Sequence, residues 1–363
     1  MALPRELLAS AETLLFAVLG GGLLQALGFP GGLVAGSTLA VAAAALAGRP
    51  MRVPPLLARP CFVLVGILLG AVVTPQTLEG ISSWPLSIAI LVVSALCMFA
   101  ATAAYLHWVH RWDPLSAVLG ASPGSMAQVM ALSAELNADI RGVAIVQVMR
   151  VVLIVLGLPG ALALSGFVVQ PLAQAQMTAS SLGELALLVL LATASAIAML
   201  RIRFPGGLLF GALAASGVLH GSGWVHVSLP WWAGSGAVIL LGAVAGARFA
   251  NTSRTILLTY LGAAFGSFAV ALFVAACFVV LVTMLLPFRM ADVAVAFAPG
   301  AQDTMMVLAL ALGLDPVYVG AHHLARFLVV SVVVVVAARR RAGRPAPSSG
   351  KPWQRPGRGT FGE

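Results

Sequence analysis

The chain has 363 residues, of which 61% are hydrophobic and 9% are charged, and its formal net charge is +9. Soluble domains carry roughly a quarter charged residues, and the surface helices of a soluble protein need a charged outer stripe. Here residues 13–48, 204–247 and 255–288 contain no Asp, Glu, Lys or Arg at all. A large soluble helical core is therefore excluded, and the sequence predicts an all-α polytopic membrane protein.

Apolar segments follow one another along the chain. The first half is expected to form helices at 13–27, 30–48, 57–73, 84–109, 114–136 and 140–164, and the second half at 181–200, 204–219, 230–249, 258–286, 290–312 and 316–338. Turns are expected at Gly28-Phe29-Pro30 and at 220–223, where Gly and Pro interrupt the apolar pattern. The first segment is predicted to be a membrane span, because Glu6 and Glu12 do not suit a cleaved signal peptide.

The two halves of the chain carry the same motifs in the same order. Phe-Pro-Gly-Gly-Leu at 29–33 returns at 204–208, and Pro123-Gly124 returns as Pro299-Gly300. Single residues then repeat at the spacing of the second pair: Met130/Met306, Leu132/Leu308, Leu136/Leu312, Asp139/Asp315, Val143/Val319 and Arg150/Arg326. Two large repeats with a site between them are typical of secondary transporters. The predicted units are a membrane repeat at 1–170, a second at 171–338 and a disordered basic cytoplasmic tail at 339–363.

Basic residues lie in different loops of the two halves. Arg49, Arg52 and Arg59 follow the second segment of the first half, whereas the matching loop at 220–230 has no Arg or Lys. Arg201 and Arg203 precede the second segment of the second half, whereas the matching turn at Gly28 has none. Because cytoplasmic loops collect Lys and Arg, the repeats are expected to face opposite ways. That inversion requires an odd number of crossings in each repeat.

The fifth segment of each half provides the odd number. Pro123-Gly124 and Pro299-Gly300 fall in the middle of these segments, and proline disfavours helix in the residue before it and removes a backbone donor. Each repeat is therefore predicted to have about five transmembrane helices plus one broken, re-entrant helix. This topology places both termini in the cytoplasm. Arg289 is an exception to the charge pattern, because the topology places it outside.

The broken segments hold one group of candidate substrate-binding residues. New half-helices present free N–H groups and a partial positive charge, which suit anions. The candidates at and after the breaks are Pro123, Gly124, Ser125, Gln128, Pro299, Gly300, Gln302, Asp303 and Thr304. An acid at membrane depth tends to mark a proton or ion path, so Asp303 is the most important of them. The alternative is that Asp303 caps the N-terminus of the half-helix.

The sixth segments hold a second group of candidates. Arg150 and Arg326 lie eleven residues after Asp139 and Asp315, at a depth where Arg is costly. Gln147, His322 and His323 stand three or four residues before these arginines, which places them on the same helix faces. The two arginines are predicted either to bind an anion between the repeats or to brace the broken helices by donating to free carbonyls. Asp139 and Asp315 are expected to cap helix six, and the Phe-Pro-Gly-Gly turns to be packing elements first.

The motifs together resemble the AbrB duplication family of bacterial integral membrane proteins over roughly residues 10–338. The resemblance rests on motifs present in two copies: Phe29–Gly32 and Phe204–Gly207, Pro123–Leu132 and Pro299–Leu308, and Gln147–Arg150 and His323–Arg326. Members of that family carry two labels, putative ammonia monooxygenase and transcriptional regulator. The residues argue against both. A copper oxygenase needs clustered nitrogen ligands, and a DNA reader needs a soluble basic domain.

The sequence therefore predicts a secondary transporter for a small organic or anionic solute, coupled to H⁺ or Na⁺. The alternative is a membrane sensor that affects gene expression indirectly and docks through its basic tail. No enzymatic activity, cofactor, metal site or direct nucleic-acid contact is expected. The expected partners are membrane lipid and a small-molecule or ion substrate, and the oligomeric state is left open, with a homodimer as one option.

Overall fold

The computed structural model describes residues 5–73, 81–122, 126–164, 182–250 and 252–342, and this part of the chain is helical throughout, without strands. The first repeat contains α1 (Arg5–Ala26), α2 (Gly32–Leu46), α3 (Pro55–Gly70), a short 3-10 turn at Ile81–Ser83, α5 (Trp84–Trp108), α6 (Pro114–Ala121), α7 (Met126–Glu135) and α8 (Ile140–Leu164). The second contains α9 (Leu182–Arg201), α10 (Gly207–Gly221), α11 (Trp231–Gly246), a 3-10 turn (η2) at Ala247–Phe249, α12 (Arg254–Leu285), α13 (Met290–Phe297), α14 (Gln302–Ala311) and α15 (Pro316–Ala342).

Ten of these helices are continuous and apolar. Seven are long and apolar enough to cross a membrane, and α2, α3 and α10 are shorter apolar helices. Five of the ten fall in each half of the chain, and the fifth segment of each half is broken into a pair, α6/α7 or α13/α14. The prediction of an all-α protein with several helices able to cross a membrane is therefore confirmed, and so is the break at Pro299-Gly300 between α13 and α14. Residues 123–125 lie outside the described part of the chain.

The two ends of the helical region differ from their predicted bounds. α1 begins at Arg5 and not at 13, and in its added turns Glu6 and Glu12 form ion pairs with Arg52 (2.7 Å) and Arg49 (3.5 Å) in the loop after α2. α15 continues to Ala342, so the prediction of a disordered tail from 339 is wrong for its first four residues. Basic residues suit the negative end of a helix dipole, which explains the extra turn.

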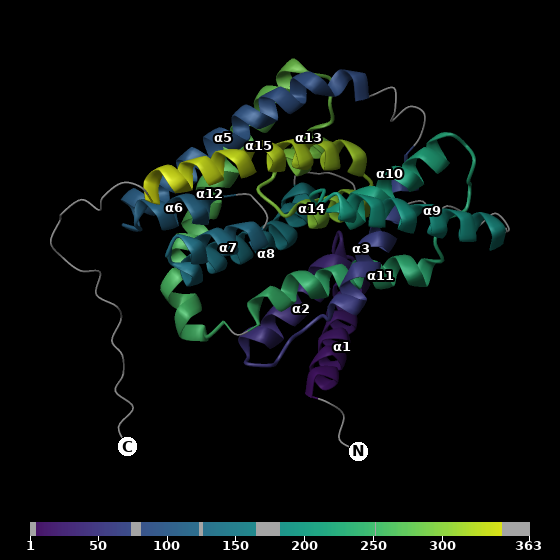
Figure 1. Cartoon of the computed structure of the whole chain (residues 1–363), viewed down its shortest axis with the longest axis horizontal. Helices are drawn as coiled ribbons and strands as arrows, with labels where there is room; N and C mark the ends of the chain where they lie inside the picture. The colour runs from purple at the N-terminus through teal and green to yellow at the C-terminus, as the bar shows by residue number, and fades with distance from the viewer. Residues whose placement is uncertain (1–4, 74–80, 123–125, 165–181, 251, 343–363) are drawn as a thin grey trace.

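Contacts between helices come in matched pairs (Figure 1). α2 packs on α11, and its counterpart α10 packs on α3. α12 packs on α8, and its counterpart α5 packs on α15. Within each repeat the broken pair packs on the helix that follows it, α6 and α7 on α8, and α13 and α14 on α15. The duplication seen in the sequence is therefore repeated in the tertiary contacts, and the two repeats interlock through exchanged helices.

Glycines permit the closest of these approaches, and they too are matched between the repeats: Gly66 and Gly70 in α3, Gly242 and Gly246 in α11. A Cβ atom at Gly66 would lie 2.4 Å from the Leu209 carbonyl oxygen, and one at Gly242 would lie 2.8 Å from the Val34 carbonyl oxygen. Both distances are too short for a real contact. Small residues let membrane helices approach backbone to backbone, and here they set the α3–α10 and α2–α11 spacing.

Gly66→Val and Gly242→Val are each expected to lower the free energy of unfolding by about 1–3 kcal/mol, because the new side chain has to displace a packed helix. The measurement is the thermal unfolding midpoint of purified protein in detergent. Gly236→Val is the matched control, since a Cβ at Gly236 in α11 meets nothing within 4 Å. Equal midpoints for all three variants would contradict this account of the helix contacts.

The Phe-Pro-Gly-Gly turns join α1 to α2 and α9 to α10. Gly31 and Gly206 adopt left-handed backbone with φ of 68° and 66°, a conformation that glycine adopts without strain. The following glycines approach the preceding helix closely, since a Cβ at Gly32 would lie 2.6 Å from the Gln25 nitrogen. The prediction that these turns are packing elements is confirmed in both copies.

The repeats differ in the placement of their second half-helix. α14 lies in the middle of the molecule, in contact with α2, α3, α8, α11 and α15, and its residues from Thr304 to Leu310 are all buried (Figure 1). α7 packs on α8 and α6 and leaves Gln128 and Glu135 exposed. The second half-helix is therefore buried much more deeply in the second repeat than in the first.

Candidate functional site

Arg326 in α15 holds the end of the broken helix α13. Its Nη1 donates to the Ala298 carbonyl (2.7 Å) and its Nη2 to the Gly300 carbonyl (2.9 Å) and to Nδ1 of His323 (2.7 Å). Because arginine only donates, His323 Nδ1 is the acceptor, and its Nε2–H is left to donate to the Val295 carbonyl at 3.2 Å. These bonds satisfy carbonyls that the break in the helix leaves without helical partners.

Arg150 in α8 makes the matching contact in the first repeat. Its Nη2 donates to the Ser122 carbonyl (3.2 Å), and Gln147 Nε2 donates to the Leu119 carbonyl (3.1 Å). Gln147 therefore does for α6 what His323 does for α13, although the residue types differ. The bracing hypothesis for the two arginines has direct contacts in both repeats. The anion-binding hypothesis concerns their remaining N–H groups, since the Nε atoms of Arg150 and Arg326 have no hydrogen-bond partner among the described residues.

A cavity of about 420 Å³ lies where the two repeats meet. The first repeat contributes Phe62, Met126, Gln147, Arg150 and Val151. The second repeat contributes Leu200, Phe204, Pro205, Gly206, Gly207, Leu208, Leu209, Arg248, Gly300, Ala301, Gln302, Asp303, His323, Arg326 and Phe327. The cavity thus joins the Phe-Pro-Gly-Gly turn of the second repeat, the break before α14 and the arginine-bearing faces of α8 and α15.

Seven of the residues predicted to bind substrate line this cavity: Gln147, Arg150, Gly300, Gln302, Asp303, His323 and Arg326. Four others do not. Gln128 is exposed on α7, Thr304 is buried within α14, and neither Pro299 nor His322 is among the lining residues. Pro123, Gly124 and Ser125 lie outside the described residues.

His322 is engaged away from the cavity. Its Nδ1 bonds to the Tyr318 carbonyl (2.8 Å) and its Nε2 to Ser87 Oγ (2.8 Å), which ties α15 to α5. The adjacent histidines therefore point to different neighbours, because successive residues on a helix are about 100° apart. Within the described ranges, no group of three His, Cys, Asp or Glu side chains could hold a metal ion.

Asp303 is the acidic residue of the cavity wall. It stands in the first turn of α14, where the helix dipole favours a negative charge. The N-cap residue of α14 is Ala301, and no side chain makes a capping hydrogen bond there. The hypothesis that Asp303 is the N-cap is therefore wrong. Its carboxylate makes no hydrogen bond or ion pair with the rest of the described chain.

Several cavity residues were missed by the site prediction. Arg248 and Phe62 lie in none of the repeated motifs, and Phe327 directly follows one of them. The second Phe-Pro-Gly-Gly turn lines the cavity as well as packing, whereas at the first turn a Cβ on Gly31 would meet Leu308 of α14 at 3.1 Å. The repeated motif was a signal for the turn, but it could not show which copy faces the cavity.

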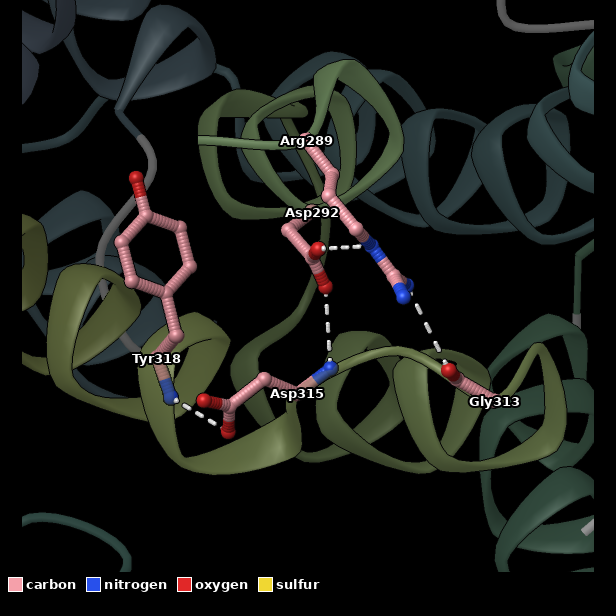
Figure 2. A network of polar contacts seen from close by, with 5 residues as sticks. All are labelled: Arg289, Asp292, Gly313, Asp315 and Tyr318. Carbon is pink, nitrogen blue, oxygen red and sulfur yellow. Dashed lines mark hydrogen bonds and ion pairs between the residues drawn. The ribbon is translucent and has the colours of Figure 1, made fainter. Parts of the chain in front are cut away.

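A second polar network fixes the start of α15 (Figure 2). The Asp315 carboxylate accepts bonds from the backbone N–H groups of Val317 (2.8 Å) and Tyr318 (3.1 Å), which confirms that it caps the helix. Asp292 accepts a bond from the Asp315 backbone N–H (2.9 Å) and one from Arg289 Nε (2.8 Å). Figure 2 shows the Asp292 carboxylate between these two donors.

The first repeat has the corresponding cap. Asp139 accepts a bond from the Gly142 backbone N–H (3.2 Å), and its own backbone N–H bonds to Ser116 Oγ (2.8 Å). Ser116 therefore takes the place that Asp292 has in the second repeat. The predicted capping role of both aspartates is confirmed, and neither belongs to the cavity.

Asp315→Ala is expected to lower the free energy of unfolding by about 1 kcal/mol, the usual cost of a lost N-cap. Burial raises the pKa of the Asp315 carboxyl, and Asp292 raises it further, although the two backbone N–H bonds act in the opposite direction. A carboxyl whose folded pKa is raised stabilises the fold below its unfolded pKa and loses that contribution as pH rises through the folded value. Asp315→Asn keeps the cap without the charge, so it should unfold no earlier than wild type at pH 8.

The measurement is the thermal midpoint of the three proteins at pH 4 and at pH 8. The alanine variant is expected to unfold below wild type at pH 8, where the asparagine variant is not. An asparagine variant as unstable as the alanine variant at pH 8 would show that Asp315 needs its charge.

The described chain has two matched sets of five continuous apolar helices, and each set also has one helix that is broken near its Pro-Gly pair. A cavity lies where the two sets meet. These features define a duplicated helical membrane protein. The chain belongs to the AbrB family, whose model, described as "Transition state regulatory protein AbrB", matches residues 33–342. It is similar to a Bacillus subtilis (strain 168) protein described as "Uncharacterized protein YhjN", with 25% identity over 74% of this chain and 74% of that protein. No solved structure matches the chain. The family resemblance inferred from the motifs is thereby confirmed.

Proposed function

We propose that the protein is a secondary transporter that carries a small organic anion across the membrane, with its two repeats inverted relative to each other. The cavity is the observation that supports this most directly. At about 420 Å³ it falls in the usual range for small-molecule sites, and Arg150 of one repeat and Arg326 of the other both line it. A site shared between repeats and built on broken helices is the arrangement that alternating access requires.

The charges of the cavity favour an anion. Arg150, Arg248 and Arg326 line it together with the single carboxylate of Asp303. Charged groups at membrane depth are costly, and they are kept where they serve a path for ions or substrates. The start of α14 adds backbone N–H groups with a partial positive charge. An anionic solute therefore meets complementary charge there, and a cationic one meets repulsion.

The side chains that line the cavity suit binding and transport without a catalytic step. Among the described lining residues there is no serine, threonine or cysteine that could act as a nucleophile. Both ring nitrogens of His323 are engaged, one with Arg326 and one with the Val295 carbonyl. These contacts support binding and translocation at this cavity.

The test is reconstitution of the purified protein into liposomes, followed by uptake of radiolabelled benzoate, lactate, succinate and glutamate. Uptake is measured under an imposed pH gradient and under an imposed Na⁺ gradient. At least one of these anions is expected to accumulate above the level of empty liposomes, and Arg150→Ala and Arg326→Ala should each remove that accumulation. Accumulation that both variants retain would exclude this cavity as the site, and no accumulation under either gradient would contradict transport of these anions.

A second candidate function is regulation, because the family model is described by a regulatory role. In that case the chain would act as a membrane sensor and affect gene expression through a partner. The basic stretch that follows α15 is the candidate docking segment. Deletion of residues 342–363 should then abolish the effect on expression while membrane insertion and solute uptake persist. An effect on expression that survives the deletion would exclude docking through this stretch.

A further inference from the structure

The lining of the cavity contains two chemically different groups of residues, which we call the polar wall and the apolar wall. The polar wall is Arg150, Arg326 and the first turn of α14, and the apolar wall is three phenylalanines from three separate elements. Phe62 comes from α3, Phe204 from the turn before α10, and Phe327 from α15. An inorganic anion would contact only the polar wall. The apolar wall therefore indicates that the ligand also has an apolar part.

The polar wall combines buried positive charge with unpaired backbone donors. Arg326 is only 2% exposed, and its terminal nitrogens donate to two carbonyls and to Nδ1 of His323, while its Nε has no hydrogen-bond partner among the described residues. Arg150 Nε also has none there. The first N–H groups of α14 lack helical partners. A carboxylate next to two guanidinium groups and these N–H groups gains charge-assisted attraction.

The charge at this wall matches one negative charge on the ligand. Arg150 and Arg326 contribute two positive charges and Asp303 contributes one negative charge, which leaves one positive charge to be balanced. Arg248 adds a further positive charge to the lining and, like Arg150 and Asp303, is half-exposed. A monoanion balances the charge of Arg150, Arg326 and Asp303 taken together, whereas a zwitterion leaves that charge unbalanced.

The apolar wall is held in place and leaves aromatic surface uncovered. Phe62, Phe204 and Phe327 are all half-buried, so each exposes part of its ring. Phe204 packs edge-to-face on Phe210 with the ring centres 6.1 Å apart, which fixes its orientation. Aromatic rings favour offset or edge-to-face contact with another ring, and covering apolar surface is favourable in itself.

We propose that the ligand of this cavity is an amphipathic monocarboxylate, with its carboxylate between Arg150, Arg326 and the start of α14 and an aromatic body against Phe62, Phe204 and Phe327. The proposed ligand class depends on the proposed function only in that the same ligand is also transported. Binding itself follows from the two walls and can be measured without any transport.

The test is calorimetric titration of the purified full chain in detergent with benzoate, acetate and benzyl alcohol. Benzoate has both the charge and the ring, acetate lacks the ring, and benzyl alcohol lacks the charge. Benzoate is expected to bind at least tenfold more tightly than either of the others. Equal affinity for benzoate and acetate, or benzoate binding that does not saturate, would overturn the proposal.

Variants of the apolar wall separate the two contributions. Phe204→Ala is expected to weaken benzoate at least tenfold and to leave acetate unchanged, and Phe204→Leu serves where the alanine variant does not fold. Phe273→Ala is the matched control, because Phe273 is 71% exposed on α12 and lies outside the cavity lining. Benzoate affinity that falls equally in the control, or not at all at Phe204, would overturn the proposal.

Measurements of benzoate binding and of anion uptake test the ligand class and the transport function separately. Tight benzoate binding without uptake of any anion would contradict transport and leave the ligand class standing. Uptake of succinate or glutamate without benzoate binding would support transport and overturn the ligand class.

Discussion

Arg326→Ala is expected to abolish anion uptake and to destabilise the protein by about 3 kcal/mol. The substitution removes the side-chain donors of the Gly300 carbonyl and of His323 Nδ1, and one of the two donors of the Ala298 carbonyl, which also accepts a bond from the Gly300 backbone N–H. Each buried acceptor left without a partner costs about 1–3 kcal/mol, and the relief of burying a charge offsets part of that cost. The break between α13 and α14 would then lose the side chain that fixes its geometry.

Comparison with Arg150→Ala distinguishes the support that an arginine gives to a broken helix from its contribution to substrate binding. Within the described residues Arg150 makes one such bond, to the Ser122 carbonyl, and it is half-buried where Arg326 is 2% exposed. Its thermal midpoint should therefore fall less than that of Arg326→Ala, whereas uptake should be lost in both. Unfolding midpoints and initial uptake rates are measured on the same preparations. Loss of stability in both variants with unchanged uptake by the folded fraction would show that the arginines only brace the helices.

Asp303→Asn is expected to uncouple transport from the driving ion. Asp303 shares the cavity wall with Arg150 on α8, with His323 and Arg326 on α15, and with Arg248 in η2. A carboxylate in the same cavity as the anion can carry the driving H⁺ or Na⁺ together with it, which couples the two movements. The asparagine side chain has a similar shape and cannot carry the proton.

The measurement compares two modes of transport in proteoliposomes. Accumulation driven by an inward proton gradient should fall to the level of empty liposomes in Asp303→Asn, whereas exchange of labelled for unlabelled substrate should persist. Glu135→Gln, at the exposed end of α7, is the control and should behave as wild type. Normal proton-driven accumulation in Asp303→Asn would exclude the coupling role. Sodium-driven accumulation that the variant loses would assign the carboxylate to Na⁺ instead.

The roles that the two repeats share were predicted from the sequence more completely than the roles in which the repeats differ. The matched pairs Asp139/Asp315 and Arg150/Arg326 perform the same contacts in both repeats, since each aspartate caps a helix and each arginine donates to the end of a broken one. Such roles depend on neighbours three to four residues away or on the repeated unit itself. The same local environment recurs wherever the motif recurs.

The differences between the repeats were harder to interpret from residue types. Gln147 and His323 differ in chemistry, and the difference suggested specialised chemistry in the second repeat, yet both donate to the equivalent carbonyl of the broken helix. The adjacent His322 and His323 looked alike, but one ties α15 to α5 and the other braces α13. A side chain's partner is set by what packs opposite it, and that neighbour can be hundreds of residues distant in the sequence.

The sequence by itself determined the membrane class, the duplication, the helix breaks and the aspartate caps, because composition, period and proline act over short stretches of chain. Only the tertiary structure decided that α14 occupies the interior while α7 stays at the periphery, and that Arg248, Phe62 and the second Phe-Pro-Gly-Gly turn meet Asp303 around one cavity. The two repeats have similar local preferences, so neither sequence favours the central position. That choice depends on close contacts between helices far apart in the chain, which no local pattern encodes.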